Sequence, residues 1–197
     1  YERGSICQLS IAEYKNGNID TIYDSLINPL CELDPTLCHI HGIMPNDIKY
    51  APCFKEAWIE IAPLIKDKKV ICHNAIFDIS AIEKAMYDNK IDPMEIIYTC
   101  SLMASRRAWP GLPTYRLNSL CERFGIEIDH HNAASDARAC CELTLRICEE
   151  MNASSLEELA WRCGTNLCSS FTNSYDPSDS SRSYPPIETI SPEAIPG

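Results

Sequence analysis

The sequence predicts an α/β fold in which a mixed sheet is flanked by helices. Residues 6–15 and 19–27 alternate apolar and polar side chains on either side of the Asn-Gly-Asn turn at 16–18, which predicts an antiparallel hairpin. The short apolar run Lys69–Cys72 has the character of a buried central strand. From Pro52 onward, helical periodicity alternates with such runs, an order typical of helices on both faces of a sheet.

The remaining elements follow from apolar spacing and from turn residues. An irregular loop is expected over residues 38–43, after the Asp-Pro turn at 34–35. Apolar side chains at steps of three and four predict the helices, and Pro110 and Gly125 end two of them. The predicted helices are Pro52–Ile65, Phe77–Asn89, Leu102–Trp109, Leu117–Phe124, Ala137–Met151 and Leu156–Cys163, the last capped by Ser155, and a further strand is predicted at Glu95–Thr99.

Composition limits the domain organisation and the class of function. The 197 residues, 45% of them hydrophobic, suffice for one sizeable domain. We place it at residues 1–164 and interpret residues 165–197, which are rich in Ser and Pro, as a disordered linker or tail. No apolar run of about 18 residues and no signal-like N-terminal segment is present, so a cytoplasmic protein is expected.

The net charge of −11 argues against a protein that coats nucleic acid, because such affinity comes from Lys and Arg neutralising phosphates. An enzyme that grips a few nucleotides with the help of divalent metals remains compatible with it. The twelve cysteines lie in apolar patterns without a Cys-x-x-Cys pair, so we interpret them as buried reduced thiols. Zinc binding by Cys31 and Cys38, or by Cys163 and Cys168, is a minor alternative because the spacing is unusual.

Two local patterns carry the candidate chemistry. The stretch His73-Asn74-Ala75-Ile76-Phe77-Asp78 follows the predicted buried strand, and His131-Asn132-Ala133-Ala134-Ser135-Asp136 leads into a helix. Ser135 is a plausible N-cap, and Asp136 falls in the first turn, where the helix dipole favours a carboxylate by about 0.3–1 kcal/mol. Alone, each pattern also fits a helix-start acid near a surface histidine. Their order along the chain points to half of a metal-dependent nuclease site.

Read in order, these patterns resemble the DEDDh family of 3′-to-5′ exonucleases, which includes the proofreading epsilon subunit of bacterial DNA polymerase III. The similarity runs from Tyr1 to about Met151 and includes Ile40-His41-Gly42-Ile43 and the stretch Trp109–Pro113. It implies a ribonuclease-H-like fold and release of nucleoside 5′-monophosphates from single-stranded DNA ends in replication or repair. A DNA 3′ end and a polymerase or other replication protein are the implied partners.

The resemblance also implies roles for single residues. Asp78 and Asp136 are expected to ligate two divalent ions, Mg²⁺ or Mn²⁺, and carboxylate oxygens suit such hard cations. His131 is expected to take a proton from the attacking water, which suits an imidazole of pKa near 6.5. Asn74 either contacts the substrate or caps the turn after its strand.

The resemblance also implies a loop that contacts the terminal nucleotide of the substrate. His41 and Ile43 belong to it, and Ile43 or Met44 can pack on a base. The alternative is a turn that packs on the core.

One motif of the family is not found. An Asp-x-Glu on the opening strand supplies two more metal ligands in the family, and only Glu2 precedes the strand at 6–15. We expect this motif upstream of Tyr1, with the first strand truncated, and an inactive or weak enzyme in the chain as given. Two alternatives stay open: an exoribonuclease that trims RNA 3′ ends, and an inactive module that binds nucleic acid or a polymerase.

Overall fold

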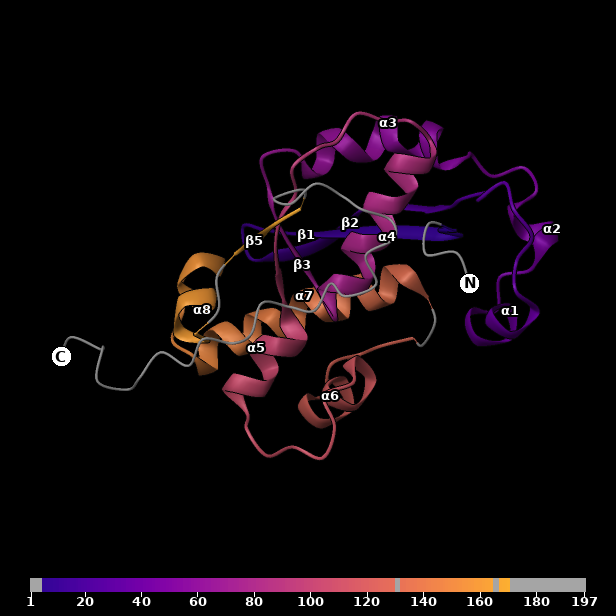
Figure 1. Ribbon diagram of the computed structural model, residues 1–197. Coiled ribbons are helices and arrows are strands. Elements are labelled where there is room, and N and C mark those ends of the chain that lie inside the picture. The colour runs from indigo at the N-terminus through magenta and orange to yellow at the C-terminus, as the bar shows by residue number, and fades with distance from the viewer. Residues whose placement is uncertain (1–4, 130–131, 165–166, 171–197) are drawn as a thin grey trace.

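The computed structural model describes residues 5–129, 132–164 and 167–170. Within these ranges the chain forms eight helices and five strands, and the strands pair into two sheets. Helices lie on both sides of the strands (Figure 1). The predicted α/β fold, a mixed sheet flanked by helices, is therefore confirmed.

The first sheet is the predicted hairpin. Strand β1 (Gln8–Lys15) runs antiparallel to β2 (Asn18–Leu26). Asn16 and Gly17 between them both have positive φ, 53° and 85°. This is the geometry of a tight two-residue hairpin turn, and it fixes which side chains of the two strands face the core.

The second sheet is mixed. Strand β3 (Lys69–Cys72) pairs in parallel with β4 (Ile97–Cys100), and β5 (Cys168–Ser169) runs antiparallel to β4. The sequence predicts both β3 and β4. The predicted start of β4, at Glu95, is two residues before the observed start at Ile97. Among the described residues no strand pairing joins β1 to β3, so contacts through the helices hold the two sheets together.

Strand β5 lies inside the segment that the sequence predicts as a linker. The Ser/Pro-rich composition predicts a linker from residue 165, but Cys168–Ser169 pairs with β4. Ser170 is only 3% exposed, and its hydroxyl accepts the Ile96 N–H at 2.7 Å, 74 residues away along the chain. A two-residue strand has no alternation to detect, and its partner is distant in sequence. Residues 171–197 of the predicted linker lie outside the described residues.

The predicted helices correspond to α3–α8, and α6 matches its predicted bounds. Among the described residues, no helix is both long and apolar enough to cross a membrane. The helices are α1 (Pro35–His41), α2 (Pro45–Ile48), α3 (Phe54–Ile65), α4 (Ala75–Asp88), α5 (Ser101–Ala108), α6 (Leu117–Phe124), α7 (Ala133–Glu150) and α8 (Leu156–Arg162).

Helix α1 contradicts the predicted loop at residues 38–43. Asp34 caps it by accepting the Thr36 N–H at 2.8 Å, and Pro35 occupies its first position. Gly42, with φ of 74°, ends it. These local signals are present in the sequence, but seven residues are too few for a clear apolar periodicity.

Two hydrophobic cores lie on opposite sides of the strands. Helices α3 and α4 cover one face and α7 the other, where it packs against β1, β2 and β3 (Figure 1). The first core includes Leu9, Tyr23, Trp58, Ile61, Val70, Ile79 and Met86. The second joins α7 to α5, α6 and α8 and includes Ala104, Leu120, Leu143, Ile147 and Leu159.

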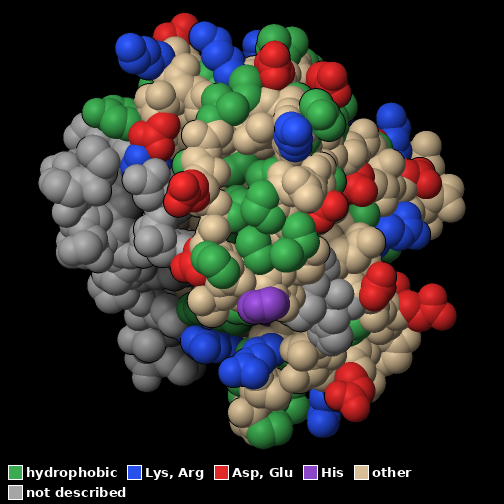
Figure 2. Space-filling model, turned by 90° about the vertical axis from the view of Figure 1, so that its right-hand side faces the viewer, with side chains coloured by type: hydrophobic (Ala, Val, Ile, Leu, Met, Phe, Trp, Pro, Cys, Tyr) green, Lys and Arg blue, Asp and Glu red, His purple; other side chains and the backbone are tan. Residues whose placement is uncertain are grey.

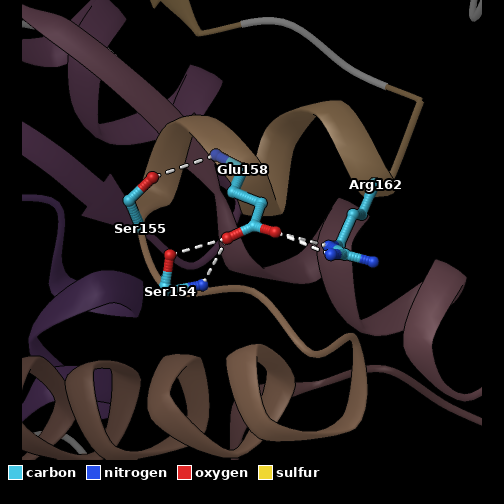
Figure 3. A network of polar contacts seen from close by, with 4 residues as sticks. All are labelled: Ser154, Ser155, Glu158 and Arg162. Carbon is cyan, nitrogen blue, oxygen red and sulfur yellow. Dashed lines mark hydrogen bonds and ion pairs between the residues drawn. The ribbon is translucent and has the colours of Figure 1, made fainter.

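Helix α8 begins with a polar network around Glu158 (Figure 3). Ser155 is its N-cap, as predicted, and the Ser155 hydroxyl accepts the Glu158 N–H at 3.1 Å. The Glu158 carboxylate accepts the N–H and the hydroxyl of Ser154, both at 2.7 Å, and a guanidinium N–H of Arg162 at 2.6 Å. The bonds from Ser154, followed by Arg162, lower the pKa of Glu158 to about 2.

Replacing Glu158 by Gln should lower the thermal midpoint at pH 7. A lowered pKa in the folded state contributes stability above the ordinary value of 4.5, and this contribution is lost as the pH falls towards 2. The difference in thermal midpoint between the variant and the unaltered protein should therefore shrink as the pH falls from 4.5 towards 2, as followed by circular dichroism. Glu122→Gln, at an exposed position of α6, is the control; an equal loss in both variants contradicts the assignment.

Candidate active site

Asp78 lies in the first turn of α4, immediately beyond β3. The sequence predicts a helix from Phe77, and the observed helix begins two residues earlier, at Ala75. Asn74 makes the turn possible because it adopts the left-handed conformation, φ 71°, which Asn tolerates better than most residues. Its carbonyl accepts the Phe77 N–H at 2.9 Å and closes the first turn.

The Asp78 carboxylate is partly buried, and its environment suits a cation. Burial raises the pKa of Asp78 to about 6, against the opposing effect of its own backbone N–H. No Lys, Arg or His forms an ion pair with it within the described ranges 5–129, 132–164 and 167–170. A buried carboxylate without a counter-charge is costly, and a divalent ion would offset that cost.

Asp136 lies in the first turn of α7, as predicted, but the predicted cap is wrong. Asn132 is the N-cap, and its side-chain oxygen accepts the N–H groups of Ala134 and Ser135 at 3.0 and 3.1 Å. The Ser135 hydroxyl instead accepts the N–H of Asp129 at 2.7 Å. Both Asn and Ser are good caps, and the helix starts at the earlier of the two.

The fold brings the two carboxylate-bearing elements together. Burial, followed by the charge of Asp78, raises the pKa of the Cys72 thiol at the end of β3. Burial also raises the pKa of Cys140 on α7 to about 12, and the charge of Asp78 adds to it. Cys140 is one helical turn after Asp136, so both residues are on the same side of α7. The charge of Asp78 therefore reaches the side of α7 that carries Asp136.

An open groove lies at the C-terminal end of α1. His39–Ile43 line one side of it, and Asp129 and Asn132 line another. The His41 ring accepts the Ile43 N–H at 3.1 Å through Nδ1. The groove thus joins the predicted nucleotide loop to the segment that flanks residues 130–131. His131, the predicted base, lies outside the described residues, so its role stays a prediction.

The structure separates the two apolar candidates of this loop. Ile43 is only 8% exposed and packs in the protein, whereas Met44 is 48% exposed. Asn74 is exposed and is the N-cap residue of α4, but its side chain makes no cap hydrogen bond, so it shapes the turn through its backbone alone. On the face that carries α1 and α2, hydrophobic side chains gather beside a histidine (Figure 2).

Phe77 is a candidate that the sequence analysis misses. It is 50% exposed, directly before Asp78, although its spacing predicts the apolar face of the helix. The sequence does contain a signal for it, namely an aromatic residue next to the candidate ligand in the first turn of a helix. Consecutive helical side chains point in different directions, so Phe77 can be exposed while Asp78 is partly buried. Its exposed ring is available to a nucleobase.

The fold, together with the order of the motifs, defines the class as an exonuclease domain of ribonuclease-H-like fold. The family described as Exonuclease (RNase_T) matches residues 1–144. The chain belongs to this family, and within it to the DEDDh exonucleases that its motifs resemble.

Individual relatives agree with this assignment. The 3′-5′ exonuclease DinG of Staphylococcus aureus strain USA300 is 31% identical over 157 residues, and DinG of strain NCTC 8325 gives the same values. The match covers 78% of this chain but only 17% of DinG. The structure of Exonuclease X in complex with 5′ overhanging duplex DNA is similar in fold, with a TM-score of 0.67 and 20% identity over 83% of this chain and 93% of the other.

Asp78→Asn should stabilise the metal-free protein at pH 7.5, by about 1–2 kcal/mol. Because the pKa of Asp78 is raised to about 6 in the folded state, its charged carboxylate lowers the free energy of unfolding above about pH 6. This destabilisation disappears as the pH falls towards the ordinary pKa of 3.8. Urea denaturation with a chelator at pH 7.5 and at pH 4 measures the gain and its disappearance. Asp92→Asn, at an exposed position, should have no effect; a destabilised Asp78→Asn protein at pH 7.5 contradicts the account.

Proposed function

We propose that this domain is a metal-dependent 3′-to-5′ exonuclease that releases nucleoside 5′-monophosphates from single-stranded DNA ends in replication or repair. The observation that carries the proposal is Asp78, a partly buried carboxylate without an ion-pair partner among the described residues. Its charge reaches Cys140, one turn beyond Asp136. Membership of the exonuclease family supports the reaction class.

In this proposal Asp78 and Asp136 are ligands of two divalent cations, Mg²⁺ or Mn²⁺. Such cations, when bound, stabilise negative charge on the phosphodiester and lower the pKa of water. His131 precedes the N-cap of α7 and accepts the proton of the attacking water. The bond between phosphorus and the 3′ oxygen of the preceding nucleotide breaks, and the terminal nucleotide leaves with its 5′ phosphate.

The terminal nucleotide is proposed to bind in the groove at the end of α1. His41 lines this groove, and Ile43 forms part of its wall from the core. The exposed side chains of Met44 and Phe77 offer apolar surfaces on which bases can stack. Asn74 offers an exposed amide in the turn before α4.

DNA is the proposed substrate, because the similar Exonuclease X structure contains DNA. A polymerase or another replication protein is the proposed partner, on the basis of the resemblance to the epsilon subunit. All twelve cysteines are free thiols, which suits a reducing compartment, and we propose the cytoplasm.

An inactive binding module is the second candidate, because the described residues offer no cluster of metal ligands. In the part of the chain that the structure describes, no three His, Cys, Asp or Glu side chains are grouped to hold a metal ion. The same residues contain no pairing between β1 and β3. A strand with an Asp-x-Glu motif at that position would add two carboxylates. We therefore propose that the 197-residue chain alone hydrolyses DNA weakly or not at all.

Digestion of a labelled single-stranded oligonucleotide in Mg²⁺ tests the proposal. A protein with an Asp-x-Glu strand before Tyr1 should shorten the strand from its 3′ end and release nucleoside 5′-monophosphates, and the chain alone should do so far more slowly. Equal rates would show that no further carboxylates are needed. No hydrolysis by either protein would favour the binding module, and faster cleavage of a matched RNA would favour the exoribonuclease.

Single substitutions in the active protein test the residue roles. Asp78→Ala and His131→Ala should each lower turnover by about 10²–10⁴-fold while the thermal midpoint does not fall. His130→Ala, at the adjacent histidine, is the matched control and should keep its turnover. Equal losses at the two histidines, or full activity without Asp78, would refute the roles.

A further inference from the structure

His73, five residues before Asp78, is held through both of its ring nitrogens. Nδ1 lies 2.9 Å from the Ser101 hydroxyl, and Nε2 lies 2.8 Å from the Tyr115 carbonyl. A carbonyl oxygen only accepts hydrogen bonds, so Nε2 carries a proton. Burial lowers the pKa of His73, which favours the neutral ring. In the neutral ring Nδ1, at 2.9 Å, then accepts the hydroxyl proton of Ser101 in preference to the Cys72 carbonyl, which lies 3.4 Å from the same hydroxyl.

Ser101 extends this contact to α7. It is the first residue of α5 and is completely buried. Its oxygen lies 3.4 Å from the Cys140 sulfur. Because the hydroxyl proton is donated to His73, the Cys140 thiol is the donor to Ser101. The result is a directed chain of hydrogen bonds from Cys140 through Ser101 and His73 to the Tyr115 carbonyl.

Cys140 and His73, two members of this chain, belong to the segments that carry the candidate metal ligands. Cys140 is one helical turn after Asp136, on the same side of α7. His73 is followed by the left-handed turn at Asn74, which opens the helix that carries Asp78. Ser101 therefore links the two carboxylate-bearing segments through His73 on one side and Cys140 on the other.

The chain also fixes the loop between α5 and α6. Tyr115, whose carbonyl accepts the bond from His73, also uses its hydroxyl. The hydroxyl donates to the Trp109 carbonyl at 2.8 Å and accepts the Leu112 N–H at 3.1 Å. The loop is thus closed on itself and attached to the turn before α4. The buried polar groups at this point are mutually satisfied, which makes the arrangement rigid.

We propose that His73 and Ser101 are positioning residues that set the separation of Asp78 and Asp136, and with it the affinity for divalent cations. The inference rests on the proposed metal-dependent function and assigns to these residues no contact with the substrate. Residues that orient metal ligands from behind typically change metal affinity or activity by about 10–100-fold when they are substituted.

Ser101→Ala, in the protein that carries the added Asp-x-Glu strand, tests this inference against a purely structural role. Ser105→Ala is a matched control: Ser105 is equally buried in the same helix, and its hydroxyl donates to the Ser101 carbonyl at 2.7 Å without joining the chain. Calorimetric titration with Mn²⁺, the thermal midpoint, and kcat and KM for an oligonucleotide are measured for both variants. Ser101→Ala should weaken Mn²⁺ binding about tenfold and lower kcat with little change in KM.

Ser105→Ala should lose thermal stability but keep its Mn²⁺ affinity. Equal Mn²⁺ affinities in the two variants, whether weakened or not, would overturn the inference. Unaltered protein that binds Mn²⁺ but hydrolyses no nucleic acid would overturn only the proposed function, and protein that binds no Mn²⁺ would overturn both.

The tautomer of His73 gives a test that needs no variant. Nitrogen-15 spectra of the unaltered protein should show a proton on Nε2 and none on Nδ1. A proton on Nδ1, in a neutral or a charged ring, would contradict the direction of the chain. Two substitutions distinguish the two ring nitrogens of His73. Asn at position 73 places a polar atom near the position of Nδ1, which contacts Ser101, and Gln places one near the position of Nε2, which contacts Tyr115. His73→Asn should therefore retain more Mn²⁺ affinity than His73→Gln.

Discussion

The packing of α7 across both sheets is the contact on which the structure depends. Within the described residues the β1–β2 hairpin and the β3–β4–β5 sheet share no strand pairing, yet α7 lies against β1, β2 and β3. Its apolar side, which includes Leu143 and Ile147, also forms the second core with α5, α6 and α8. Because hydrophobic packing places this helix, it also determines where the first turn of α7, with Asp136, lies relative to the end of β3.

The burial of Asp78 beside α7 lowers the stability of the metal-free protein. Asp78 is partly buried with a raised pKa, and Cys72 and Cys140 beside it have raised pKa values as well, so the thiols remain protonated and add no charge. A carboxylate kept in such surroundings without a described counter-ion destabilises the metal-free fold. The same feature favours a divalent cation, because the cation removes the cost. Selection for function at this position therefore opposes selection for stability.

Features with strong local signals could be predicted from the sequence. The hairpin follows from alternation around an Asn-Gly turn, and α6 follows from its apolar spacing and the closing Gly125. Features that depend on distant partners could not. Strand β5 exists because Cys168–Ser169 meets β4, and Ile43 is buried because the turn after α1 packs inward. Motif order predicts Asp78 and Asp136 as metal ligands, and that assignment stays a prediction, whereas the contacts of Ser101 with His73 and Cys140 require the fold.

Diffraction from crystals soaked in Mn²⁺ tests the central claim most directly, namely that α7 and the turn after β3 bring Asp78 and Asp136 to one metal site. An anomalous difference map collected at the manganese absorption edge locates the ion without reference to activity. The account predicts manganese at this site, with Asp78 and Asp136 each bonded to an ion at about 2.0–2.3 Å from a carboxylate oxygen. Manganese bound elsewhere, with no ion at either carboxylate, would contradict it.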